Sequence, residues 1–225
     1  MYRFSLANSV SSRTQVVDRR VFEEALNNPK VENICRSIAE IAAQMGKCTD
    51  ETTRKQMRDK MGELKRGLPG FCWHAEEFKD GKRNAFSAIP SKLTMIDVDH
   101  VDEPQKLFES IKAAALTIGL VAAHITPSTF GLRLIFVRAE GVAIEQHQAW
   151  ITERLQLKDV DGCTKDLPRL SFVVPRRYWL YIDYDALFEE KTVELPTAEL
   201  RGTGATVETQ HATSQQTKLQ VGEAN

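Results

Sequence analysis

The sequence predicts an α+β protein with an RRM-like or ferredoxin-like core, preceded by a mainly helical accessory region. In the second half of the chain, apolar runs rich in β-branched residues alternate with amphipathic helices. The resulting order, β-α-β-β-α-β, is that of the split βαβ fold and of RNA-recognition-type sheets. The predicted elements are, in order, 92–98, 104–118, 120–125, 132–137, 142–157 and 170–174, with 178–182 as a candidate fifth strand.

Local signals delimit these elements. Pro104 falls in the first turn of the first core helix, after Asp102 or Glu103 as the N-cap, and Gly119 ends that helix. The turn at 127–131 is short and contains Pro and Gly, so we expect the second and third strands to form a hairpin.

The first 90 residues are predicted to contain a strand at 2–6 and then three helices. The helices are expected at 18–26, 31–45 and 50–66. The apolar face of the second helix would consist of Ile34, Ile38, Ile41 and Met45. The third helix is highly charged, with a narrow apolar edge at Met57, Met61 and Leu64, and its Lys and Arg residues are interpreted as a solvated face.

We therefore divide the chain into three parts. Residues 1–90 form the accessory α/β part, and residues 91–190 form the RRM-like core. Residues 191–225 are predicted to be a disordered tail or linker, because the chain has no Phe, Trp or Tyr from residue 197 onward and cannot bury enough apolar surface there.

Composition excludes several classes of protein. The 225 residues include 30 Lys and Arg against 31 Asp and Glu, so no global basic field attracts nucleic acid or membrane. No stretch approaches the roughly 20 apolar residues of a membrane span, and the N-terminus lacks the pattern of a signal peptide. The four cysteines are scattered, which favours reduced thiols and a cytoplasmic location.

Asp97 and Asp99 are the most informative polar residues. They end the first core strand, and because strand side chains alternate, both point to the same face. Unpaired, the two carboxylates would repel each other and would be penalised by desolvation. A divalent cation removes that penalty, so the pair predicts a site for Mg²⁺ or Mn²⁺. The alternative is an ordinary helix cap or a surface salt bridge.

Two further segments carry complementary chemistry. The turn before the third strand contains Ser128, and Arg133 begins that strand, a pattern that can bind phosphate through amides and a guanidinium. The alternative is an ordinary Ser/Gly hairpin with a surface Arg. Before the fourth strand, Asp161 (or Asp166) supplies a third carboxylate. Lys165 and Arg169 in the same segment supply cations for a triphosphate. Three carboxylates flanked by cations are typical of a two-metal nucleotidyl-transfer site.

These segments resemble the three-motif order of the archaeo-eukaryotic primase superfamily. More narrowly, the chain resembles the VirE N-terminal-type primase-polymerase domains of bacterial mobile elements, over most of residues 1–190. The resemblance implies that Asp97, Asp99 and Asp161 are catalytic and bind the metals. It also implies that Ser128 and Arg133 bind nucleotide phosphates.

Four other basic residues are candidates for binding nucleic acid. Lys82 and Arg83 lie in a loop that could follow a template backbone. Arg176 and Arg177 precede Tyr178 and Trp179, a mixture of cations and aromatic rings that single-strand binders use. The alternatives are a solvated loop and an edge strand kept soluble by charge.

The expected function is therefore a DNA primase-polymerase domain that transfers nucleotides from NTP or dNTP onto a 3′-hydroxyl in replication of a mobile element or phage. The expected partners are single-stranded or primed DNA template and a helicase, with no membrane. One alternative is a non-catalytic nucleic-acid-binding or helicase-recruitment module with the same fold. The other is a sugar-nucleotide transferase, for which the predicted helices before the DxD pair offer no Rossmann-type half.

Overall fold

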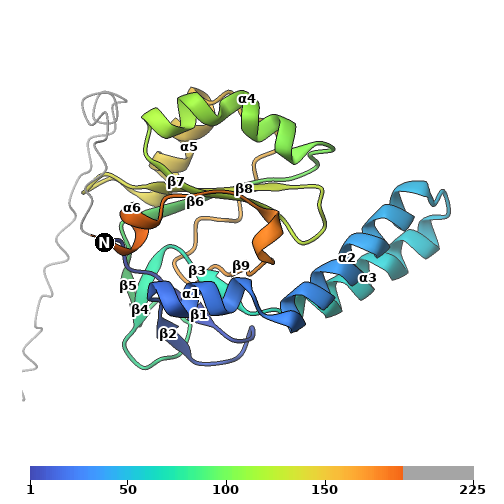
Figure 1. The fold of residues 1–225 in the computed structure, drawn as a ribbon, viewed down its shortest axis with the longest axis horizontal. Coiled ribbons are helices and arrows are strands. Elements are labelled where there is room, and N and C mark those ends of the chain that lie inside the picture. Colours follow the sequence, from blue (N-terminus) through green and yellow to red (C-terminus); the bar gives the residue numbers. More distant parts are fainter. Residues whose placement is uncertain (190–225) are drawn as a thin grey trace, which may run out of the picture.

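The computed structural model describes residues 1–189 and shows a mixed α and β architecture built on antiparallel sheets. Two helices, α4 (Pro104–Thr117) and α5 (Ile144–Arg154), cover one face of the sheet in the upper half of Figure 1. Two others, α2 (Pro29–Lys47) and α3 (Glu51–Arg66), project from the body as a helical hairpin. These helices overlap those predicted from the sequence.

The first sheet belongs mostly to the N-terminal part of the chain and has the strand order β2-β1-β3-β9. Its strands are β1 (Ser5–Ala7), β2 (Thr14–Val16), β3 (Gly70–Cys72) and β9 (Ser171–Phe172). A separate two-stranded sheet pairs β4 (Ala75–Phe78) with β5 (Ala88–Pro90). The accessory part therefore contains more strand than the sequence predicted.

The second sheet has the order β10-β7-β8-β6. Its strands are β6 (Leu93–Val98), β7 (Leu120–Ile125), β8 (Leu132–Val137) and β10 (Trp179–Ile182). The three predicted strands that became β6, β7 and β8 are confirmed, and the first and third are neighbours as expected. The β7–β8 hairpin is also confirmed.

The predicted membership of segment 170–174 in this second sheet is wrong. β9 pairs with β3 of the first sheet, and β10 occupies the fourth position, beside β7. Gly70 permits the β3–β9 contact, because a Cβ at that position would lie only 2.8 Å from the side chain of Leu170. Because β10 lies beside β7 and no strand of residues 1–189 lies on the side of β6 away from β8, β6 is at the edge of its sheet. The split βαβ order would instead put this first core strand in the centre.

The buried stripe of α2 differs from the predicted face. It consists of Val31, Cys35, Ile38 and Ala42. The predicted residues Ile34, Ile41 and Met45 are half-buried along its margin, where they still pack against the main core. α2 is covered on two sides, by the body of the protein and by α3, so its apolar surface is wider than one stripe.

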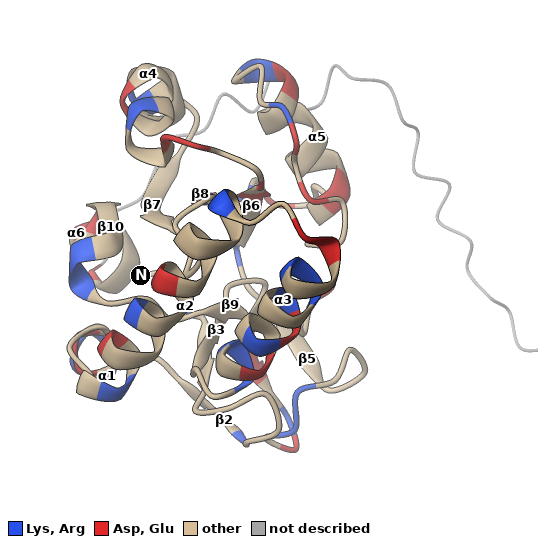
Figure 2. Ribbon diagram, turned by 90° about the vertical axis from the view of Figure 1, so that its right-hand side faces the viewer, with Lys and Arg blue, Asp and Glu red and all other residues tan. Residues whose placement is uncertain are grey.

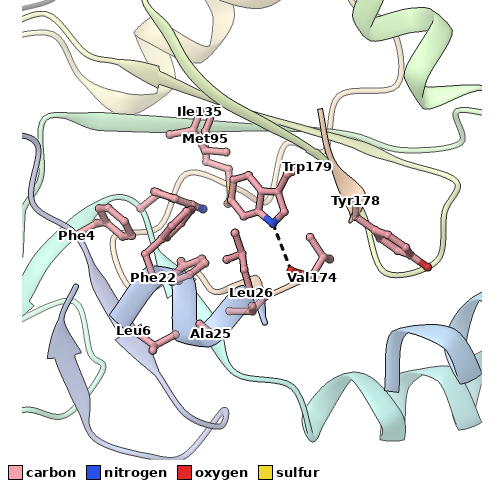
Figure 3. Close-up of a cluster of buried hydrophobic side chains, with 14 of the residues drawn as sticks. Phe4, Leu6, Phe22, Ala25, Leu26, Met95, Ile135, Val174, Tyr178 and Trp179 are labelled. Atoms are coloured by element: carbon pink, nitrogen blue, oxygen red, sulfur yellow. Dashed lines mark hydrogen bonds between the residues drawn. The ribbon is translucent and has the colours of Figure 1, made fainter. Parts of the chain in front are cut away.

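One hydrophobic cluster joins the two sheets and α1 (Arg19–Leu26). Figure 3 shows Met95 and Ile135 of the second sheet above the indole of Trp179, with Phe22 on the opposite side of the cluster. The ring centroids of Phe22 and Trp179 are 5.2 Å apart, and the Trp179 indole N–H donates to the Val174 carbonyl at 3.3 Å. Residues from both predicted parts, 1–90 and 91–190, therefore contribute to a shared core.

The short helix α6 (Tyr184–Phe188) closes the described part of the chain. The tail predicted at 191–225 lies outside the described residues. Among residues 1–189, none of the helices has the length and apolar character needed to cross a membrane.

Candidate active site

A row of four side chains crosses one face of the second sheet. Asp97 of β6 pairs with Arg133 of β8, Arg133 pairs with His124 of β7, and His124 pairs with Trp179 of β10. Directly paired residues in antiparallel strands lie on the same face. Met95, two residues before Asp97, belongs to the cluster between the sheets, so the row faces the first sheet.

Asp97 and Arg133 form a buried ion pair, and each is only 7% exposed. Arg133 also donates to the hydroxyl of Ser171 at 3.0 Å, so it connects the second sheet to β9 of the first. The second carboxylate oxygen of Asp97, Oδ1, and the Nε of Arg133 are buried and have no hydrogen-bond partner among the described residues. The pair therefore retains an acceptor and a donor for a ligand.

The third carboxylate reaches this site through backbone pairing. Val98 and Val160 form an isolated antiparallel bridge at the free edge of β6. On either side of it, the Asp161 amide donates to the Asp97 carbonyl at 2.9 Å, and the Asp99 amide donates to the Asp159 carbonyl at 3.0 Å. The bridge sets Asp161 opposite Asp97, at the end of β6 that carries the DxD pair.

The charges of the three carboxylates act on one another. Burial raises the pKa of Asp99, and the negative charges of Asp97 and Asp161 raise it further, whereas Arg133 and His100 act in the opposite direction. The ionised form of Asp99 is therefore disfavoured by its surroundings. The half-buried Asp161 also accepts a hydrogen bond from the Cys163 amide at 2.8 Å.

The donor set fits a hard divalent cation in its chemistry. Carboxylate oxygens are the ligands that Mg²⁺ and Mn²⁺ prefer, and a cation would offset both the repulsion at Asp99 and the unpartnered oxygen of Asp97. Within residues 1–189, however, no three His, Cys, Asp or Glu side chains are grouped closely enough to form a metal site. Asp97 is instead paired with Arg133.

The turn between β7 and β8 brings Ser128 to the same end of the sheet. A Cβ on Gly131 would lie 2.7 Å from the Thr126 hydroxyl and 3.1 Å from the Val98 carbonyl, so the turn needs glycine there. Thr129 has a positive φ of 66°, and the Ser128 and Thr126 hydroxyls are 3.3 Å apart. The turn therefore packs directly on the end of β6.

The two cations predicted beside Asp161 have other partners. Lys165 is exposed and pairs with Glu145 of α5 at 3.1 Å, which raises the pKa of Lys165. Arg169 donates to the Cys163 carbonyl and lies 4.0 Å from Asp166. These contacts stabilise the loop around Asp161.

Three of the four residues predicted to bind nucleic acid have partners within the protein. Arg83 donates to the carbonyls of Pro168 and Val10, each at 2.7 Å, and so ties two loops together. Arg177 pairs with Glu32 of α2, and Arg176 lies over the Tyr184 ring. The fourth, Lys82, is exposed in its loop.

Sequence reasoning missed one cation of the site, Lys65. This half-buried residue lies near the end of α3, where burial and the Arg133 charge lower its pKa and the charges of Asp97 and Asp99 raise it. The available signal was its spacing, because Lys65 follows Met61 by four residues and so shares the apolar edge of the helix. Its assignment to a solvated face was wrong.

A family of known proteins is similar to the part of the chain that contains the candidate site. A family model described as BT4734-like, N-terminal domain, matches residues 63–174. The matched segment begins in α3 and ends just after β9, and it includes Asp97, Asp99, Asp161 and Lys65. Comparison with curated proteins and with solved structures found no match.

Proposed function

We propose that this protein is a metal-dependent primase-polymerase domain related to the archaeo-eukaryotic primase superfamily and its VirE N-terminal type. The observation that carries the proposal is the bridge between Val98 and Val160, because it brings Asp161 to the DxD pair beside Arg133. Three carboxylates from two separate segments that lie beside a cation at one strand end are the groups that nucleotidyl transfer uses.

In this reaction the 3′-hydroxyl of a primer attacks the α-phosphorus of NTP or dNTP. An O–P bond forms, the bond to the β-phosphate oxygen breaks, pyrophosphate leaves and the hydroxyl proton passes to solvent. Bound Mg²⁺ or Mn²⁺ would activate the hydroxyl and stabilise the leaving group. Asp97, Asp99 and Asp161 would hold the metals, while Arg133 and Ser128 would orient the phosphates.

We further propose that the second sheet, with α4 and α5, is an RRM-like core. Strands β6, β8 and β7 follow one another across the sheet in the order expected for this arrangement. The fourth strand departs from it, since β10 lies beside β7 rather than beside β6. A DNA template, a helicase partner, a cytoplasmic location and a role in a mobile element or phage belong to the same proposal.

Primer extension tests the proposal. The assay would use a primed single-stranded template, labelled dNTPs and NTPs, and Mn²⁺, with Asp99→Asn and Asp161→Asn beside the wild type. Asp159→Asn is the matched control, because Asp159 is exposed and contributes its backbone carbonyl to Asp99. We expect extension by the wild type and the control, and only background by the two site variants. Equal extension by all four proteins would exclude this site.

A second candidate is a non-catalytic nucleic-acid-binding or helicase-recruitment module. The observation in its favour is that Asp97 is paired with Arg133 and that no group of three metal-ligating side chains exists within residues 1–189. This candidate predicts that Asp97→Ala, assayed at a temperature at which its melting curve shows it folded, binds template like the wild type. It also predicts no nucleotide incorporation by the wild type in Mg²⁺ or Mn²⁺. A gel-shift assay run beside primer extension separates the two candidates.

A further inference from the structure

We infer that α3 provides the phosphate-binding side of a nucleotide pocket, with Lys65 and Arg54 as the residues that contact the phosphates of a nucleoside triphosphate. The inference rests on the proposed function and deepens it, because it moves phosphate binding from the loop around Lys165 and Arg169 to the helical hairpin.

A pocket of about 330 Å³ separates the α2–α3 hairpin from the carboxylate end of the second sheet. One wall comes from the hairpin and includes Arg54, Met61 and Lys65. The opposite wall includes Asp99 at the end of β6 and Ser128 in the β7–β8 turn. Small-molecule sites typically occupy about 300–1,000 Å³, so the volume of this pocket lies at the lower end of that range. It is continuous with the candidate active site through Asp99.

Helix periodicity puts both cations on one edge of α3. Arg54, Met61 and Lys65 are spaced by seven and four residues, which is two turns and then one turn of an α-helix. Met61 is buried on this edge, and both cations are half-buried. In Figure 2, which views the molecule from the hairpin side, blue segments recur along α3. The edge that holds the helix against the body therefore also carries positive charge.

Both cations are poorly satisfied by the protein itself. Burial and the nearby charge of Arg133 disfavour the charged form of Lys65, and the charges of Asp97 and Asp99 offset this only in part, so that the pKa of Lys65 is lowered. The Nε of Arg54 is buried and has no hydrogen-bond partner among the described residues. An anion in the pocket would compensate both groups, and charge-assisted hydrogen bonds to phosphate are roughly twice as strong as those between neutral groups.

The rest of the pocket favours a nucleotide over a bare anion. Met45 and Met61 line the hairpin side, and Phe130, which is 38% exposed, lines the turn side. Phe130 offers a ring face on which a base can stack, and the methionines offer adaptable apolar contacts. Phosphates at the cations and a base at the apolar surface together describe a nucleoside triphosphate.

The position of Lys65 is fixed by the end of its helix. The Gly67 amide donates to the Leu64 carbonyl at 3.0 Å, and the Leu68 amide donates to the Lys65 carbonyl at 3.1 Å. Leu68 is fully buried, and β3 begins two residues later. The backbone at Lys65 is thus held by the core, whereas Lys165 lies on an exposed loop and already pairs with Glu145.

Calorimetric titration of the full chain with ATP, dATP and inorganic tripolyphosphate, in EDTA so that no metal contributes, tests the inference. Lys65→Met removes the charge but keeps an unbranched side chain, and Lys60→Met is the matched control because Lys60 is exposed on the same helix. We expect Lys65→Met to weaken binding of all three probes about tenfold, equivalent to about 1.4 kcal/mol, and Lys60→Met to bind like the wild type. Arg54→Met should weaken binding in the same direction.

The outcomes separate this inference from the proposed function. If nucleotide binding depends on Lys65 but the protein extends no primer, the nucleotide pocket stands and the proposed polymerase function is contradicted. Primer extension in which Lys65→Met has the wild-type KM for dNTP would retain the polymerase and overturn the pocket. Absence of binding by the wild type, or equal weakening by Lys65→Met and Lys60→Met with unchanged melting curves, would also overturn the inference.

Discussion

The backbone amide of Asp161 donates to the carbonyl of Asp97 at 2.9 Å, although 63 residues of sequence separate the two aspartates. This contact and the adjoining Val98–Val160 bridge extend the second sheet by a short segment beyond β6. Backbone pairing of this kind fixes position without depending on side-chain charge. Asp99 and Asp161 can therefore be replaced individually while the segments that carry them stay in register, whereas Asp97 is held in the buried pair with Arg133.

Asp99→Asn should stabilise the metal-free protein. The pKa of Asp99 is raised in the folded protein, so the folded protein binds the Asp99 proton more tightly than the unfolded chain does. Protonation of Asp99 therefore stabilises the fold, and this stabilisation is lost as the pH rises through the folded pKa. At neutral pH the charged carboxylate is thus unfavourable, and the neutral amide removes that cost. We expect a higher melting temperature in EDTA, measured by differential scanning fluorimetry.

The same variant should respond less to metal. Mn²⁺ should raise the melting temperature of the wild type by stabilising the folded state that binds it. Asp99→Asn should show a smaller increase, and Asp159→Asn should match the wild type. An equal Mn²⁺ response in all three would contradict the assignment of Asp99 as a metal ligand.

Arg133→Met should destabilise the fold strongly. The substitution leaves Asp97 buried without its partner, and breaking one side of a buried pair costs about 3–5 kcal/mol. The double variant Asp97→Asn/Arg133→Met removes the unpaired charge, so it should recover part of the loss. Urea denaturation of the three proteins gives the comparison, and additive losses in the double variant would show that the pair is not coupled.

Gly131→Ala should disrupt the turn that carries Ser128. The added methyl group would meet the Thr126 side chain and the Val98 carbonyl, and forcing extra volume into such a contact costs about 1–3 kcal/mol. Gly62→Ala is the control, because Gly62 lies inside α3 and a methyl group there would have no atom within 4 Å apart from its chain neighbours and the backbone of its own helix. Alanine at that position should stabilise the helix by about 0.5–1 kcal/mol. In urea denaturation we expect the free energy of unfolding to fall in Gly131→Ala and to rise in Gly62→Ala. Equal changes in the two variants would contradict the close packing at Gly131.

The protein should lose stability in mild acid because of His147. This histidine is fully buried in α5 against Trp150, and burial lowers its pKa from 6.5 to about 4. Between these values the unfolded chain binds a proton that the folded protein does not, so stability falls as the pH falls through this window, by up to about 1.4 kcal/mol per pH unit.

His147→Phe tests this acid sensitivity. Both ring nitrogens of His147 lack a hydrogen-bond partner among the described residues, so an apolar ring is a suitable replacement. Urea denaturation at several pH values between about 4.5 and 7 should show a shallower pH dependence for the variant. His74 and His124, whose pKa values are also lowered by burial, to about 4 and about 3, should maintain the remaining slope. If the free energy of unfolding of His147→Phe depended on pH as steeply as that of the wild type, His147 would not be the source of the acid sensitivity.

The sequence predicted most elements because their causes are local. β7 and β8 have the predicted bounds, and Asp18 and Asp50 cap the helices that follow them. The sheet to which β9 belongs was not predictable in this way. Its pairing with β3 depends on the absence of a side chain at Gly70, about one hundred residues earlier, which is a tertiary contact that no local pattern contains.

The same distinction applies to the candidate site. Asp97 and Asp99 were identifiable because strand alternation is a local rule, whereas the engagement of Lys165 with Glu145 and of Arg177 with Glu32 depends on how distant helices pack. Lys65 falls between these cases. Its position on the apolar edge of α3 was visible in the sequence, but the identity of the surface opposite that edge was not.

The segment 161–170 connects the two sheets as a tether. It leaves the edge of β6 at the Val98–Val160 bridge and enters β9, where Ser171 accepts a hydrogen bond from Arg133. One end of the segment is therefore paired with the second sheet and the other end belongs to the first sheet. Arg133 links the two sheets near these ends through its hydrogen bond to Ser171. A change in the separation of the sheets would strain both the tether and the Arg133 contact. The geometry of the carboxylates therefore depends on the distance between the two sheets, which the shared hydrophobic cluster fixes.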